Sequence, residues 1–132
     1  NRTVAKAREL ALLASSAGLT ASGEGLNAQP APSDMPLVVV NASASSLQGD
    51  SLDIDAGWWK QAVLCVDMMY SAKPTAFMQT ALANRQSLEV VDGLGMLVNQ
   101  AALAFEIWTG LKPDAHSTLA RMRQTLTMKS HA

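Results

Sequence analysis

Residues 88–110 read LEVVDGLGMLVNQAALAFEIWTG, and this stretch decides the fold. It opens with a short apolar run over 88–91, which is typical of a buried strand. Asp92-Gly93-Leu94-Gly95 then turns the chain into a helix over about residues 95–109, which Gly110 and Pro113 end. A strand, a tight turn and a long helix in this order are the repeating unit of α/β proteins.

The same alternation runs through the rest of the chain. Continuous apolar runs at 36–40 and 62–67 predict two further strands, buried on both faces. The stretches 19–35 and 42–61 are expected to be irregular, with at most one short strand in the first. Helices are predicted over 3–17, 75–86 and 114–128, with Thr3, Thr75 and either Asp114 or Ser117 as caps and Gly18 as a stop. This pattern predicts a parallel sheet covered by helices on both faces and built from right-handed βαβ units.

Size and charge exclude several classes of protein. The chain has 132 residues and a mass of 13.9 kDa, which is room for one domain. Ten basic and eleven acidic side chains give a net charge of −1, which argues against a nucleic-acid surface and a polybasic membrane surface. The sequence has no apolar run of the ~18 residues that a membrane span needs, and its N-terminus is not that of a signal peptide.

The few cysteine and histidine residues narrow the chemistry further. A single cysteine, Cys65, excludes an internal disulfide and a cysteine-based zinc cluster, and indicates a cytoplasmic location. Cys65 lies within an apolar run, where a small core residue is expected rather than a nucleophile. His116 and His131 both lie near the end, so no histidine-rich metal site is expected. The chain begins at Asn1 as if a strand were ending there, and we expect it to be truncated.

Candidate site residues are those that end the predicted strands. Ligands of parallel sheets bind beyond the carboxyl ends of the strands. Four clusters of the chain follow such ends: Asn1-Arg2-Thr3, Asn41-Ala42-Ser43, Asp67-Met68-Met69-Tyr70 and Asp92-Gly93-Leu94-Gly95-Met96. In a dinucleotide-binding sheet, an arginine placed like Arg2 accommodates the 2′-phosphate of NADP, and Thr3 adds a hydroxyl at a helix N-terminus. The alternative is a solvated arginine beside a helix cap.

The long helix carries two different faces. Gly93, Met96 and Gln100 share one side, where the Gln100 amide can hydrogen-bond a polyhydroxylated substrate. An apolar stripe on another side is predicted to pack on the sheet: Leu94, Leu97, Val98, Ala101, Phe105 and Trp108. A rim position without function is the alternative for Gln100.

Met68 and Tyr70 follow the predicted strand at 62–67 and are candidate binding residues. Met68 offers a soft surface to a flat ring and Tyr70 a hydroxyl, with ordinary packing as the alternative for both. No lysine ends a predicted strand and no general acid–base pair stands out, so no catalytic residue and no metal ligand are assigned.

Four motifs in order resemble the shikimate dehydrogenase family over essentially the whole chain. Residues 90–110 are similar to its C-terminal signature, and Asn1-Arg2-Thr3 is similar to its NRT motif. Asn41-Ala42-Ser43 resembles its NAT element, although the Thr and the following Gly are lost. Residues 67–75 resemble its DMxY…TP segment, with Thr75-Ala76 in place of TP.

The resemblance implies the fold, reaction and cofactor of that family. It implies an α/β, partial Rossmann-like, doubly wound parallel sheet that serves as the C-terminal NADP-binding domain over residues 1–132. The family reduces 3-dehydroshikimate to shikimate with NADPH, in the pathway to chorismate and aromatic amino acids. By motif position, the cofactor would meet Asn1, Arg2 and Thr3 at its 2′-phosphate end and Met68, Gly93 and Met96 at its nicotinamide end. Tyr70 and Gln100 would reach the substrate hydroxyls.

The resemblance also implies what lies outside this chain. The family's catalytic Lys and Asp belong to an N-terminal substrate lobe, and its first strand and glycine-rich loop would precede Asn1. We therefore expect that lobe as a partner and expect the chain alone to be inactive. Alternatives left open are a stand-alone nucleotide-binding or assembly module and a quinate/shikimate enzyme that prefers NAD, against which Arg2 argues. A homodimer also stays open.

Overall fold

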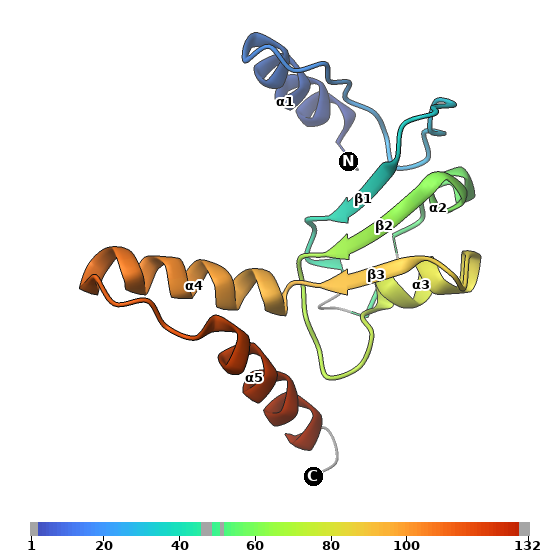
Figure 1. Cartoon of the computed structure of the whole chain (residues 1–132). Coiled ribbons are helices and arrows are strands. Elements are labelled where there is room, and N and C mark those ends of the chain that lie inside the picture. The colour runs from blue at the N-terminus through green and yellow to red at the C-terminus, as the bar shows by residue number, and fades with distance from the viewer. Residues whose placement is uncertain (1–2, 46–48, 51, 130–132) are drawn as a thin grey trace.

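The computed structural model describes residues 3–45, 49–50 and 52–129. Within these residues, three parallel strands form one sheet in the order β1-β2-β3 (Figure 1). The elements in chain order are α1 (Val4–Ser16), β1 (Leu37–Asn41), α2 (Ala56–Gln61), β2 (Ala62–Asp67), α3 (Ala76–Asn84), β3 (Glu89–Asp92), α4 (Leu94–Thr109) and α5 (Ala115–Lys129). The predicted α/β class with a parallel, Rossmann-like sheet is confirmed.

The strand register brings three polar residues into one row at the carboxyl edge of the sheet. Asn41 pairs with Asp67, and Asp67 pairs with Asp92. Each is the last residue of its strand, and all three are buried. Because the strands are parallel, the loops that follow them leave from the same edge.

The hydrophobic core lies under one face of the sheet, which α2 and α3 cover. Val39, Cys65 and Val90 are neighbours in register on this face and pack on Trp59 and Phe77. The two aromatic rings meet edge to face, with centroids 5.3 Å apart. The six-residue helix α2 lies within residues 42–61, which were expected to be irregular, so that expectation is wrong here.

The opposite face of the sheet corrects the expectation of strands buried on both sides. Val38, Val40 and Val91 are 49%, 54% and 42% exposed. None of the described side chains of α1 is buried, so this helix adds little cover. An unbroken apolar run therefore predicted the strands correctly, but not the burial of their second face.

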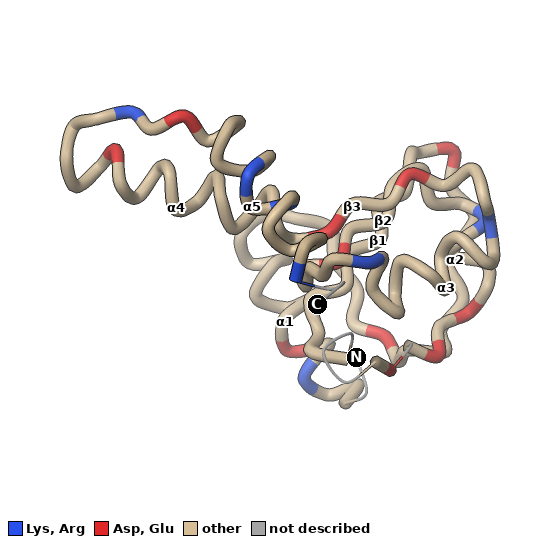
Figure 2. The backbone as a smooth tube through the Cα atoms, turned by 90° about the horizontal axis from the view of Figure 1, so that it is seen from below, with Lys and Arg blue, Asp and Glu red and all other residues tan. Residues whose placement is uncertain are grey.

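The helix after β3 also packs differently from the expectation. Leu97, Ala101 and Phe105 face α5 and line a cavity of about 280 Å³ between the two helices. Figure 2 shows that α4 projects from the sheet as an arm and that α5 runs back from its far end towards the sheet. The prediction that the apolar stripe packs on the sheet is wrong: of its residues only Leu94 and Val98 are buried, Val98 also lines the cavity beside α5, and Trp108 is 82% exposed.

Most predicted helix ends are confirmed within one or two residues. Thr75 caps α3 by accepting a hydrogen bond from Met78 N at 3.3 Å, and Thr3 is the N-cap residue of α1. Asp114, rather than Ser117, starts α5, because its carboxylate accepts from both Ser117 N and Ser117 Oγ. The described part of residues 19–35 contains no strand. No described helix is both long and apolar enough to span a membrane.

Truncating the buried ring of Phe77 should destabilise the core. Phe77→Ala removes a side chain that is 2% exposed, and we expect a loss of about 3–5 kcal/mol in the free energy of unfolding. Phe77→Leu keeps most of the apolar volume and should lose clearly less. Urea denaturation measures both, and equal midpoints for the two variants would contradict this account of the core.

Candidate functional site

The centre of the carboxyl edge is the buried side chain of Asp67. Its Oδ1 accepts hydrogen bonds from Asn41 Nδ2 at 3.2 Å and from Met69 N at 3.0 Å. Its Oδ2 accepts from Thr75 Oγ1 at 2.6 Å. Asp67 is fully buried, and these donors compensate the loss of its hydration. One carboxylate thus joins the end of β1, the loop after β2 and the start of α3.

The loop after β1 is held by its own asparagine. Asn41 Oδ1 accepts from Ser43 N at 3.0 Å and from Ser43 Oγ at 2.7 Å, which closes a short turn. Ser43 stands where the resembling family has Thr, and its hydroxyl makes a bond that a threonine hydroxyl can also make.

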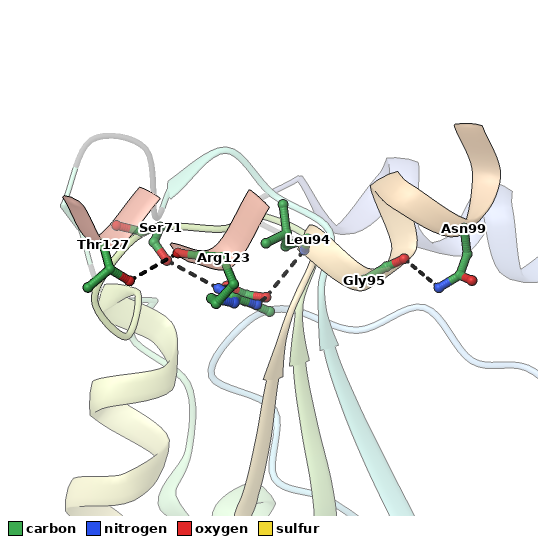
Figure 3. A network of polar contacts seen from close by, with 7 residues as sticks. Ser71, Leu94, Gly95, Asn99, Arg123 and Thr127 are labelled. Carbon is green, nitrogen blue, oxygen red and sulfur yellow. Dashed lines mark hydrogen bonds and ion pairs between the residues drawn. The ribbon is translucent and has the colours of Figure 1, made fainter. Parts of the chain in front are cut away.

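The loop after β3 is fixed by an ion pair with the last helix. Arg123 of α5 donates from Nη1 to Asp92 Oδ2 and from Nη2 to Asp92 Oδ1, both at 2.6 Å. Figure 3 shows Arg123 beside Leu94 at the start of α4. Asp92 Oδ1 also accepts from Leu94 N at 3.2 Å at the start of α4. Burial alone would raise the pKa of Asp92, but the hydrogen bonds from Arg123 and Leu94 and the Arg123 charge outweigh it and hold this pKa below its usual value.

Two of the edge loops touch each other directly at Gly93. Gly93 N donates to Met69 O at 3.0 Å. A Cβ on Gly93 would lie 1.9 Å from Met68 O, closer than any real contact allows. Glycine is therefore required here by the approach of another backbone, not by its own dihedral angles, since φ is −74°.

The structure brings together some of the residues predicted for the site. Met68, Tyr70 and Gly93 lie on the two touching loops, with Met68 40% and Tyr70 37% exposed. Met96 and Gln100 follow on exposed positions of α4, whereas Leu94 and Val98 are buried. The shared side predicted for Met96 and Gln100 is thus an open face of the helix.

The cluster at the start of the chain is described only in part. Asn1 and Arg2 lie outside the described residues, and Thr3 is exposed at the start of α1. From α1, Ala7 lines a cavity of about 340 Å³ together with Val40 and Asn41. Helix α1 therefore flanks the same end of β1 from which the Asn41 loop leaves.

Sequence reasoning missed the residues that hold this edge together. Asp67 was predicted only as part of a cluster, although a carboxylate that ends an apolar run signals a buried anchor. Arg123 was not singled out, and its partner Asp92 is 31 positions away in the chain. Nothing in the local sequence of α5 announces that contact.

The chemistry available at this edge is binding chemistry. Exposed methionine side chains, a close glycine backbone and hydrogen-bonding groups suit a flat ring with polar substituents. Within residues 3–45, 49–50 and 52–129, no group of three or more His, Cys, Asp or Glu side chains could hold a metal ion. Burial raises the pKa of Cys65 to about 11, so this thiol stays protonated and unreactive at neutral pH, as expected for a core residue.

Comparisons with known proteins identify similar chains. The family model described as the Shikimate 5'-dehydrogenase C-terminal domain matches residues 93–127. A shikimate dehydrogenase (NADP(+)) of Cupriavidus pinatubonensis is 42% identical over 96% of this chain and 44% of its own length. One of Bordetella petrii is 49% identical over 70% of this chain and 32% of its own length. The chain thus spans less than half the length of these curated relatives.

Solved structures share the fold at lower identity. A shikimate dehydrogenase in complex with NADP+ is 26% identical, with a TM-score of 0.71, and the match covers 96% of this chain and 45% of that one. The ligand-free 5-ketofructose reductase of Gluconobacter sp. strain CHM43 is also 26% identical, with a TM-score of 0.74, over 95% of this chain and 45% of that one.

Replacing each of the two glycines after β3 by alanine should have different effects on stability. Gly93→Ala forces the backbone of Met68 away, and we expect a loss of about 1–3 kcal/mol in the free energy of unfolding. Gly95→Ala is the matched control, because its Cβ would meet Leu119 Cδ2 at an ordinary 3.9 Å inside α4. It should leave stability unchanged or raise it by about 0.5–1 kcal/mol. Thermal or urea unfolding measures both, and equal effects would refute the close approach at Gly93.

The Asp92–Arg123 pair should give a defined pH dependence. The pKa of Asp92 is lower in the folded state than its ordinary value of 3.8, so ionised Asp92 stabilises the fold above that pH. This contribution is lost as the pH falls through the folded pKa. Asp92→Asn should lower the free energy of unfolding by about 1–2 kcal/mol at neutral pH. The loss is no larger because Arg123 is partly exposed and water screens the ion pair. In urea titrations, the gap between wild type and variant should narrow below about pH 4, and a constant gap down to pH 2 would speak against it.

Proposed function

This chain is a homologue of the C-terminal part of shikimate dehydrogenases, and we propose that it is the NADP-binding part of such an enzyme. The observation that carries the proposal is the 42% identity over 96% of the chain, which includes the loops at the carboxyl edge. The 5-ketofructose reductase and the NADP+-bound shikimate dehydrogenase share the fold at the same 26% identity, so the choice of shikimate as substrate rests on the curated relatives at 42% and 49% identity. Residues 1–132 would then form one domain, with the substrate lobe elsewhere in the protein.

The proposed reaction is the reversible, NADPH-dependent reduction of 3-dehydroshikimate to shikimate. NADPH, when bound, supplies the hydride that adds to the carbonyl carbon, while a proton adds to the carbonyl oxygen. We assign no acid–base group to this chain. The catalytic Lys and Asp of the family would come from the N-terminal substrate lobe. The role of the chain is to hold and orient the cofactor against the substrate.

We assign the cofactor to two groups of residues. Arg2 and Thr3 would bind the 2′-phosphate and Asn1 the adenosine ribose, because a guanidinium and a hydroxyl at a helix N-terminus suit a phosphate. Met68, Gly93 and Met96 would lie along the nicotinamide end. Their support is the direct contact between the loops of Met68 and Gly93 and the 40% and 46% exposure of the two methionines.

We assign the substrate to the polar side chains beside that end. Tyr70 is 37% exposed on the loop after β2, and Gln100 lies exposed on α4. A phenol and an amide can donate and accept hydrogen bonds to a ring that carries several hydroxyls.

The substrate lobe would pack on the projecting arm. The outer half of α4 exposes Leu103, Ile107 and Trp108 to 59%, 72% and 82%. Large apolar side chains gathered in this way mark an interaction surface. The curated relatives are more than twice as long as this chain, which leaves room in such a protein for a lobe here. The cytoplasmic location and a homodimer stay predictions.

Substituting Arg2 should separate NADP from NAD in the complete protein. The wild type should reduce NADP+ in the presence of shikimate. Arg2→Ala should weaken NADP+ binding by about 1–3 kcal/mol through the lost charged hydrogen bond and leave NAD+ binding unchanged. Arg8→Ala, at an exposed position of α1, is the control for a lost positive charge. Titration calorimetry and initial rates measure the effects. Equal losses for both cofactors would refute the role of Arg2, and a wild type without shikimate-dependent activity would refute the function.

A further inference from the structure

Arg123 links the last helix to both of the touching edge loops. Besides its two bonds to Asp92 on the loop after β3, its Nη1 lies 3.4 Å from Ser71 O on the loop after β2 (Figure 3). Its backbone is held in α5, where Thr127 Oγ1 donates to Arg123 O at 3.0 Å. One guanidinium thus bridges three segments that are distant in the sequence.

The carboxylate that Arg123 holds also sets the start of α4. Asp92 is 9% exposed, and its Oδ1 accepts from Leu94 N while it receives the guanidinium. A shift of this carboxylate would therefore move the first turn of α4, which carries Met96.

The two loops have no spare room between them. Gly93 N is bonded to Met69 O, and the space beside Gly93 Cα is filled by Met68 O. The spacing of Met68 and Met96 is therefore fixed by how these loops are pressed together, and Arg123 contacts both of them from outside.

Helix α5 is held by this contact as well as by its packing on α4. None of its described side chains is buried, and the space between α4 and α5 retains a cavity. A bidentate ion pair of this geometry fixes orientation as well as distance, which a looser apolar contact does not.

We propose that Arg123 is a positioning residue for the nicotinamide end of the cofactor site. By clamping the loop of residues 68–71 against the loop of residues 92–96, it sets the separation of Met68 and Met96. This inference rests on the proposed function. It assigns to α5 a part in cofactor geometry, although Arg123 itself contacts neither cofactor nor substrate.

The test compares two ligands in the complete protein. NADP+ has both ends, whereas adenosine 2′,5′-bisphosphate carries the phosphate end without the nicotinamide. Arg123→Gln should weaken NADP+ about tenfold and lower kcat, because a small misplacement of the reacting ring is costly. The affinity for adenosine 2′,5′-bisphosphate should not change. A purely structural role of Arg123 would not alter the ratio of the two affinities.

Further variants keep the test decisive if Arg123→Gln folds poorly. Arg123→Lys retains the positive charge but cannot make the bidentate contact of a guanidinium. It should change the ratio of the two ligand affinities less than Arg123→Gln does. Asp92→Asn should reproduce the shift, and combining it with Arg123→Gln should add little, since both remove one pair. Arg121→Gln, an exposed arginine of the same helix, is the matched control and should behave as wild type.

The outcomes separate this inference from the function on which it rests. A changed affinity ratio in the Arg123 variants, with Arg121→Gln unchanged, supports it. An unchanged ratio in both Arg123 variants, or equal weakening of both ligands, overturns it while the wild type still binds NADP+. A wild type that binds neither ligand overturns the proposed function and this inference together.

Discussion

The carboxylate of Asp67 is the interaction on which the rest of the structure depends. It is fully buried at the end of the central strand, where a carboxyl group without hydrogen-bond partners would be costly. Its donors come from β1, from the loop after β2 and from the cap of α3, so one carboxylate ties these three segments together. Thr75 does two tasks with one hydroxyl: it donates to Asp67 and accepts from Met78 N, which starts α3. The sheet edge and the helix that covers the core are thereby fixed by the same atoms.

At each strand end, the buried last residue holds the structure together, and the exposed residues that follow it are the ones that we propose to meet the ligand. The last residue of each strand is turned inward and buried, as Asn41, Asp67 and Asp92 are. The residues that come next, such as Met68, Tyr70 and Met96, are partly exposed. The two neighbouring acids are compensated differently: Asp67 receives an amide, a backbone N–H and a hydroxyl, whereas Asp92 receives a cation. This local compensation keeps two carboxylates compatible with an edge that we propose to meet a negatively charged cofactor.

The local sequence pattern predicted most helices and strands correctly, but it predicted their packing partners less well. Strand β2 was predicted over its full span, because AVLCVD is an apolar run with no competing signal. Helix α2 was missed, because six residues that include Gly57 show too little periodicity. The placement of α4 was wrong because an apolar stripe does not state which partner covers it, and α5 rather than the sheet does so. The clusters at strand ends were predictable from topology alone, but Arg123 was not, since its pairing is set by tertiary packing.

The burial of Cys65 has a practical consequence. It is the sole thiol of the chain and lies at the middle strand against the core that α2 and α3 cover. A thiol reagent can reach it only when that side of the sheet opens, so the rate of its labelling reports local opening of the core without any engineered probe. Because the loops of the carboxyl edge contain no cysteine, ligand contact there would not block the reagent directly. A ligand that slowed the labelling would be acting through the stability of the sheet, and the native chain thus carries its own sensor of coupling between edge and core.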